Sequence, residues 1–159
     1  MPMNGLGQAA IPIVGNSYGA GNHDRIKEAI RTILPIACGI AVFATVLFLA
    51  IPRVLLGLFS PSPEMLTVGV PAMRIIAPTF VFASVTTILG YAMSGLGNGI
   101  VNMLGTAIRQ LILFVPLAWL FARTWDVGAA WWSLWISEIA AAVYAVLASR
   151  GVMKRSGVI

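Results

Sequence analysis

The sequence predicts an all-α membrane protein, a polytopic helical bundle with four full transmembrane helices and a partial, shorter one at the N-terminus. Of its 159 residues, 59% are hydrophobic and only 9% are charged, and its mean hydropathy is +0.93. Soluble domains carry about 25% charged residues, so this chain lacks the polar groups that cover a water-facing surface. The composition excludes soluble enzymes, nucleic-acid binders and disordered chains. Residues 1–159 are interpreted as a single membrane domain.

Apolar runs long enough to cross about 30 Å of hydrocarbon define the individual elements. The runs show no period-two alternation, and backbone exposed to lipid must bond internally, so each run is expected to be helical. The four full spans lie near 33–52, 70–94, 100–122 and 128–149. A Gly-rich stretch at 4–20 is too short and too polar for an independent full span. No internal repeat stands out between these segments.

The basic residues predict the orientation. Ten Lys and Arg stand against five Asp and Glu, a net charge of +5, and such an excess is typical of cytoplasmic loops. The basic residues gather in a loop at 19–31 and in a tail at 150–159, namely Arg25, Lys27, Arg31, Arg150, Lys154 and Arg155, whereas the opposite loops hold Arg53 and Arg123. Four spans separate the two basic regions, so both, with the C-terminus, are expected in the cytoplasm. The tryptophans Trp119, Trp125, Trp131 and Trp132 suit the outer interface.

Residues for catalysis and metal binding are scarce. Cys38 is the single cysteine, which excludes an internal disulfide, and His23 is the single histidine, which leaves no histidine-based metal cluster. His23 is expected in a solvated loop, so no Ser/His/Asp set is expected and no cofactor is implied. The first ten residues lack the basic start and apolar core of a signal peptide. The sequence supports no enzymatic activity.

The string GNSYGAGN at 15–22 is the most distinctive. Gly15 and Gly19 form a GxxxG pair, which permits close helix contact, while Gly21 and Asn22 are typical of a helix end. A phosphate-binding loop is disfavoured because no strand precedes the string and no Lys-Ser/Thr follows. Helix packing and termination are the better interpretation.

Prolines inside the spans are candidates for breaks. Pro35, Pro78 and Pro116 each remove a backbone donor. Such breaks are ordinary kinks in some bundles and line binding sites in transporters. Three of them in four spans favour a protein that moves.

Polar residues within the spans share helical faces. The third span has Asn102, Thr106, Arg109 and Gln110; the second has Ser84, Thr87, Tyr91 and Ser94; the fourth has Ser133, Ser137, Ala141, Tyr144 and Ala148. Such faces serve as interhelical contacts or as cavity walls, and the two interpretations do not exclude each other. The first span has only Cys38 and Thr45 as weakly polar groups and is expected to face lipid.

Charged residues within spans are expensive and point to function. They are Arg74, Arg109 and Glu138. Arg109 lies about nine residues from the cytoplasmic end of its span and Glu138 about ten from the outer end, so both sit roughly 14–15 Å deep. We therefore predict that they pair. The alternatives are that Arg109 meets backbone carbonyls, that a protonated Glu138 points into a cavity, or that Arg74 is the partner.

Several strings, taken in order, resemble one family across the whole chain. GLGQAAIPIVGNSYGAGNHDRIKEAIR at 5–31 resembles helix 8 of the multidrug and toxic compound extrusion (MATE) transporters, and MRIIAPTFVFASVTTILGYAMSGLGNG at 73–99 resembles helix 10. Arg109-Gln110 with LILFVPLAWL resembles helix 11, and WISEIAAAVYAVL, which includes Glu138, resembles helix 12.

The resemblance implies a lobe of a larger transporter. Family members have twelve helices in two lobes around a central cavity and expel cationic and aromatic drugs in exchange for protons or sodium. This chain would supply helices 8 to 12 in the inner membrane, without helices 1–7 of the family, as a fragment, a truncated reading frame or part of a split gene. Gln8 takes a cavity position in the family pattern and joins Ser84, Thr87 and Tyr91 as a candidate lining residue.

No coupling carboxylate of the family carries over to this sequence. The family places coupling carboxylates on helices 1, 7 or 10, and the helix-10 segment here has no Asp or Glu. Two other interpretations stay open: a lipid-linked oligosaccharide flippase of the same superfamily, and a non-transporting membrane fragment.

Overall fold

The computed structural model describes residues 2–59, 62–124 and 127–158. Trp125, which was predicted at the outer interface, and Asp126 lie outside these ranges. The described residues contain helices and no strand, which confirms the all-α bundle. The elements are α1 (Pro2–Gly19), α2 (His23–Ala50), α3 (Pro52–Gly57), α4 (Pro63–Ile76), α5 (Thr79–Gly95), α6 (Gly99–Ala107), η1 (Ile108–Phe114), α7 (Val115–Thr124), α8 (Val127–Ala130) and α9 (Trp132–Arg155).

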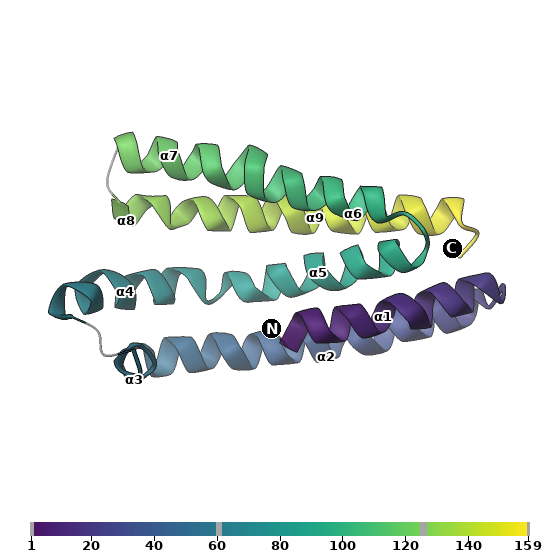
Figure 1. Cartoon of the computed structure of the whole chain (residues 1–159), viewed down its shortest axis with the longest axis horizontal. Coiled ribbons are helices and arrows are strands. Elements are labelled where there is room, and N and C mark those ends of the chain that lie inside the picture. Colours follow the sequence, from purple (N-terminus) through teal and green to yellow (C-terminus); the bar gives the residue numbers. More distant parts are fainter. Residues whose placement is uncertain (1, 60–61, 125–126, 159) are drawn as a thin grey trace.

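The long helices lie side by side along one axis, and the short α3 runs across it (Figure 1). α5 is the central helix and packs against α1, α2, α6 and α9. α1 begins about midway along the bundle and runs to the end at which the C-terminus lies (Figure 1). Three helical stretches are long and apolar enough to cross a membrane: His23–Ala50, Gly99–Thr124 and Gly128–Arg155. A fourth crossing exists if α4 and α5, which are bent by 54° relative to each other, count as one span.

The start of α2 corrects the sequence interpretation. The hydrophilic run at 19–31 was expected to be a loop, but from His23 onward it is helical. The helix begins there because the Asn22 side chain accepts a hydrogen bond from the Arg25 amide at 3.1 Å and Asp24 lies in the first turn. His23 is therefore the first helical residue rather than part of a solvated loop, and its Nδ1 is buried. The tail expected from 150 is likewise helical as far as Arg155.

Three helices end in the same turn at one end of the bundle. α1, α5 and α9 each close with a glycine at positive φ, namely Gly21, Gly97 and Gly157. The amide after each glycine bonds to the carbonyl five residues earlier, a Schellman motif: Asn22 to Ser17, Asn98 to Met93 and Val158 to Met153, each at 2.9 Å. The first two turns share the pattern Gly-x-Gly-Asn, at 19–22 and 95–98. This is a short repeat that the sequence analysis missed.

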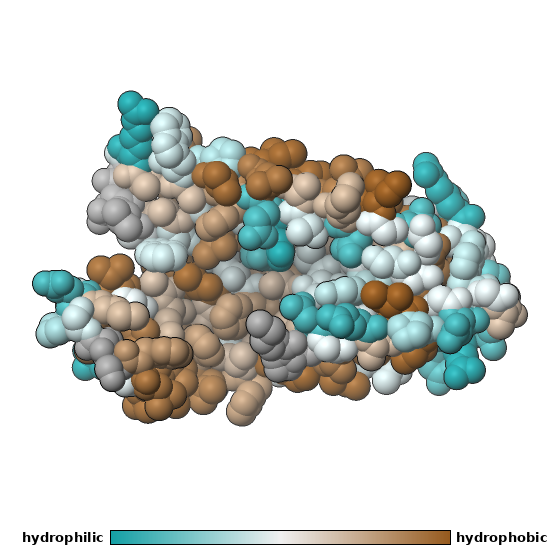
Figure 2. Space-filling view, viewed as in Figure 1, coloured by the Kyte–Doolittle hydropathy of each residue, from teal (hydrophilic) through white to brown (hydrophobic). Residues whose placement is uncertain are grey.

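The same end collects a hydrophobic cluster and the basic residues. Val158 folds back into a buried cluster formed with Val14, Ile26, Met93, Leu96 and Val152. The start of α2 and the end of α9, which carry the basic residues, lie together at this end (Figure 1). Figure 2 shows hydrophilic residues gathered there as well.

Pro78 breaks the span between α4 and α5. Three carbonyls just before the break receive side-chain donors from three helices. These bonds are Trp135 Nε1 to the Ile75 carbonyl at 2.8 Å, Thr79 Oγ1 to Ile76 at 2.7 Å, and Thr45 Oγ1 to Ala77 at 2.8 Å. Side chains of the bundle therefore bond the backbone at the break.

The other two prolines differ. Pro35 lies inside α2, which continues through it. Pro116 lies in α7 just after η1, a π-helical segment. A proline lacks an N–H and its ring clashes with the carbonyl four residues earlier, here that of Ile112. A π-helical turn widens the backbone at this point, and such segments are frequent at functional sites.

Candidate functional site

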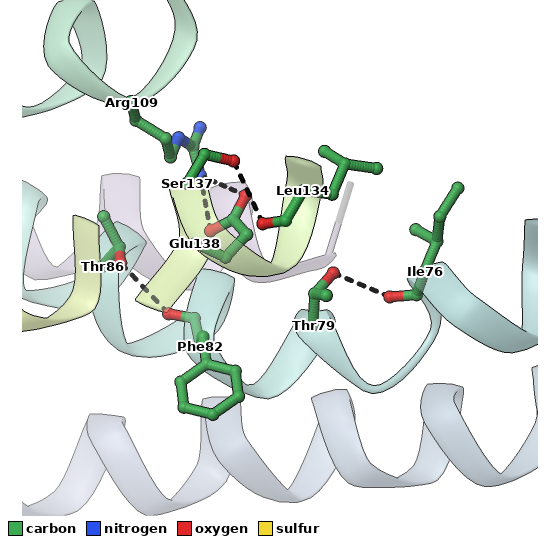
Figure 3. Close-up of polar contacts among 8 residues, drawn as sticks. All are labelled: Ile76, Thr79, Phe82, Thr86, Arg109, Leu134, Ser137 and Glu138. Carbon is green, nitrogen blue, oxygen red and sulfur yellow. Dashed lines mark hydrogen bonds and ion pairs between the residues drawn. The ribbon is translucent and has the colours of Figure 1, made fainter. Parts of the chain in front are cut away.

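The predicted ion pair is present. Arg109 reaches from η1 to Glu138 on α9, with 3.1 Å between Nη1 and Oε1 (Figure 3). Nη1 also donates to Oε2 at 3.3 Å. The side chains are 23% and 11% exposed, respectively. Arg74, the rival partner, lies near the end of α4 and forms no ion pair within the described residues.

Small residues on α9 allow this helix to pack closely on α5 beside Glu138. Ser133, Ser137 and Ala141 are at most 1% exposed and lie on the face that packs on α5. Each serine hydroxyl donates to the backbone carbonyl three residues earlier: Ser133 Oγ to Ala130 of α8 at 2.6 Å and Ser137 Oγ to Leu134 of α9 at 3.0 Å (Figure 3). Tyr144 on the same helix donates to the Val101 carbonyl of α6 at 3.1 Å. This face of α9 is an interhelical contact, and Glu138 stands at its edge toward η1.

A polar groove of about 220 Å³ opens beside the ion pair, between α1, α5, α6 and η1. It is lined by Asn4, Thr86, Thr87, Tyr91, Asn102, Thr106 and Arg109, each of which carries a polar group. Figure 2 shows hydrophilic residues in the middle of the molecule, between more apolar helices. The groove is smaller than the 300–1,000 Å³ of typical drug sites, so it accommodates part of such a molecule.

Two glycines let the groove-lining side chains fit. A Cβ at Gly7 of α1 would overlap the ring of Tyr91, and a Cβ at Gly90 of α5 would overlap the Asn102 amide. Asn102 lies close enough to α5 to donate from Nδ2 to Ser94 Oγ at 3.0 Å. The groove wall thus depends on close approaches of α1 and α6 to α5.

Some groups in the groove have no protein partner. Thr86 and Thr106 hydroxyls donate to carbonyls of their own helices. Among the described residues, nothing bonds to the Thr87 or Tyr91 hydroxyls, nor to Nε and Nη2 of Arg109. These are the groups that remain for a ligand or for water.

Ser84 does not belong to the groove, which corrects its prediction as a lining residue. It is fully buried, donates to the Val81 carbonyl at 2.7 Å and lies 3.5 Å from Cys38 Sγ on α2. Its face of α5 is covered by α2 at this level, whereas Thr87 and Tyr91 lie farther along the helix. Gln8 and Gln110 are exposed and lie outside the groove lining.

The predicted glycine pair has only one member in a contact. A Cβ at Gly15 would lie 3.3 Å from the Gly95 carbonyl oxygen, so α1 and α5 approach closely there. Gly19 has open space around it, and Gly21 (φ 68°) forms the turn. The residues that the sequence analysis missed are Asn4, Thr86 and Trp135. For Asn4 and Thr86 the available signal was a polar residue within an apolar stretch.

The described residues include no group of three or more His, Cys, Asp or Glu side chains suited to a metal ion. The residues that line the groove offer hydrogen bonds and the charge of Arg109. This is the chemistry of a binding wall in a membrane bundle.

The fold and groove are those of a helical membrane bundle with a polar pocket, and comparison with known proteins gives the family. The MatE family model matches residues 1–120. The chain belongs to the MatE family. It is 30% identical over 162 residues to a "Probable multidrug resistance protein NorM" of Pseudomonas putida, covering 98% of this chain and 35% of that protein. It is 23% identical over 144 residues to the Thermotoga maritima protein of the same description, covering 91% and 31%.

Two solved structures have the same fold. One is described as the inward-facing conformation of a multidrug resistance MATE family transporter of the MOP superfamily; it matches with a TM-score of 0.90 at 20% identity, over 98% of this chain and 37% of that one. The Vibrio cholerae MATE transporter VcmN in the bent form matches with a TM-score of 0.83 at 17% identity, over 91% and 33%. The chain therefore spans about a third of the length of its relatives.

Proposed function

We propose that this chain forms part of the C-terminal lobe of a secondary active multidrug efflux transporter, in which small cationic or aromatic drugs are exchanged for H⁺ or Na⁺. The observation that supports the proposal is the polar groove in the middle of a MatE-family bundle, in which the Thr87 and Tyr91 hydroxyls and the Nε and Nη2 donors of Arg109 have no partner among the described residues. Polar groups at such depth are expensive in lipid and are typical of a substrate pathway. The rest of the cavity would come from the remaining helices of a full-length family member, including its N-terminal lobe.

The broken and π-helical segments support movement of one lobe against another. Discontinuous helices near the midplane are common in transporters that alternate access. The basic end of the bundle would face the cytoplasm of the inner membrane, by the excess of Lys and Arg there. Glu138 lies within α9, and both its oxygens accept hydrogen bonds from Arg109.

A chimera tests this proposal. The matching third of the P. putida relative is replaced by this chain, and ethidium efflux is measured in an efflux-deficient host, with the unmodified relative as control. We expect efflux from the chimera and no resistance from this chain expressed alone, because one lobe cannot enclose a two-sided cavity. If the chimera reaches the membrane at the level of the control but shows no ethidium efflux, the proposal is contradicted. That result would favour the non-transporting interpretation. Resistance from the isolated chain would contradict the need for a second lobe.

A further inference from the structure

The guanidinium of Arg109 uses only part of its hydrogen-bonding capacity. It carries five N–H donors, and the two on Nη1 are directed at the Glu138 carboxylate. The three donors on Nε and Nη2 have no protein acceptor among the described residues. The side chain is 23% exposed and lines the groove. The unpaired donors are therefore available to whatever occupies the groove.

The rest of the lining supplies more donors and no anion. Thr87 and Tyr91 have hydroxyls without partners in the described part of the chain, and Asn4 contributes an amide. Arg109 is the only charged residue among the described lining residues. Glu138 lies on α9 with both oxygens bonded to Arg109, so it offers no free carboxylate to a ligand. A ligand that fits this groove presents acceptor atoms to Arg109.

We propose that the groove binds an oxyanion of its ligand, a carboxylate or a phosphate, through the Nε and Nη2 donors of Arg109. A planar guanidinium matches such groups with two parallel hydrogen bonds. Glu138 acts as a positioning residue that holds Nη1 and turns the other donors toward the groove. The inference rests on the proposed function and deepens it: drugs that carry an oxyanion beside a cationic centre would bind this groove, in addition to purely cationic drugs. A lipid phosphate is the other source of the same chemistry.

A matched pair of probes tests the oxyanion. The zwitterion 4-(trimethylammonio)benzoate and its methyl ester share a shape and a cationic centre, and only the first has a carboxylate. Their binding to the purified chain is measured by equilibrium dialysis in maltoside micelles, which contain no phosphate, against protein-free micelles. We expect the zwitterion to bind about tenfold tighter or more, the factor that corresponds to about 1.4 kcal/mol.

Variants separate recognition from folding. Arg109→Gln should remove the preference, and Arg109→Lys should keep only part of it, since an ammonium cannot form the two parallel bonds. The double variant Arg109→Gln/Glu138→Gln removes the pair without leaving an unpaired charge and should also bind both probes equally. Arg74→Gln, at an arginine outside the groove, is the matched control and should keep the full preference.

Two competitors distinguish the sources of the oxyanion. If phosphatidylglycerol displaces the zwitterion from the unmodified chain and diacylglycerol does not, the natural ligand is a lipid phosphate. If neither lipid displaces the zwitterion, the natural ligand is a free solute. Equal binding of the two probes to the unmodified chain, no binding of either, or an undiminished preference in folded Arg109→Gln and double variants would each overturn the inference. None of these results affects the chimera's ethidium efflux, since ethidium has no oxyanion. The efflux experiment therefore tests the proposed function independently of the oxyanion site.

Discussion

Neutralising Glu138 should destabilise the bundle, because the substitution leaves Arg109 charged and without its partner. The 3.1 Å contact joins side chains that are only 23% and 11% exposed, so solvent screens the pair weakly. Breaking a buried pair by removing one partner costs about 3–5 kcal/mol in soluble proteins, and an unpaired charge at mid-membrane costs about 2.5–3.5 kcal/mol on insertion scales. Arg109 borders a groove, and the amide introduced by Glu138→Gln would still accept a hydrogen bond from it. We therefore expect this substitution to lower the free energy of unfolding by about 2 kcal/mol.

A double-mutant cycle measures the coupling. Unfolding in mixed micelles is followed for Glu138→Gln, Arg109→Gln and the double variant, with Arg74→Gln as a control that should change stability by less than about 0.5 kcal/mol. The double variant should recover part of the loss, because two amides can bond to each other and no charge is stranded. We expect a coupling energy above about 1 kcal/mol. If the two single effects add to within about 0.5 kcal/mol of the double effect, the pair contributes no mutual stabilisation and the reasoning fails.

Two further predictions concern α5 and its neighbours. Trp135→Phe removes the donor to the Ile75 carbonyl and should lower the free energy of unfolding by about 0.6–1.7 kcal/mol, the range for hydrogen bonds within membranes. Trp119→Phe, at an exposed position, is the control and should not lower it. Equal effects of the two substitutions would contradict the role of the Trp135 indole N–H. In a Cys38→Ser background, cysteines replacing Thr87 and Tyr91 should react with a water-soluble thiol reagent in the purified chain, while Ser84→Cys should stay inert. A Ser84→Cys variant that reacts as fast as Thr87→Cys would show that α2 does not cover this face.

Much of the fold follows from hydropathy, since an apolar run of membrane length leaves the backbone little alternative to a helix. The start of α2 did not follow, because His23, Asp24 and Arg25 lower the hydropathy while the Asn22 cap and the glycine turn before it fix the helix start. Helix ends depend on a few hydrogen bonds that a hydropathy average does not register. The Gly-x-Gly-Asn repeat at 19–22 and 95–98 was the readable signal.

The sequence predicted those site contacts that depend on the depth of a residue in its span. It did not predict which neighbouring helix covers a given side chain. Arg109 and Glu138 were paired from their distance along antiparallel spans, a quantity that the chain itself fixes. Ser84, Thr87 and Tyr91 share one face of α5, but that face meets α2 at Ser84 and the groove at the other two. Because α5 is surrounded by helices, its helical wheel does not say which neighbour covers each turn.

The break at Pro78 shows the same dependence of a local feature on neighbouring helices, and its bonds resist bending of α4 against α5. A proline predicts a lost backbone bond, but only the assembled bundle shows that Thr45 from α2 and Trp135 from α9 donate to carbonyls beside the break. Bending α4 further relative to α5 would therefore break bonds to two other helices as well as the Thr79 bond within the break (Figure 3). Within the described residues, no comparable side-chain bonds hold the backbone of η1, whose link to a neighbour is the Arg109–Glu138 pair beside the groove. η1, which contributes Arg109 to the groove, therefore has fewer side-chain bonds to resist a change of shape than the break at Pro78.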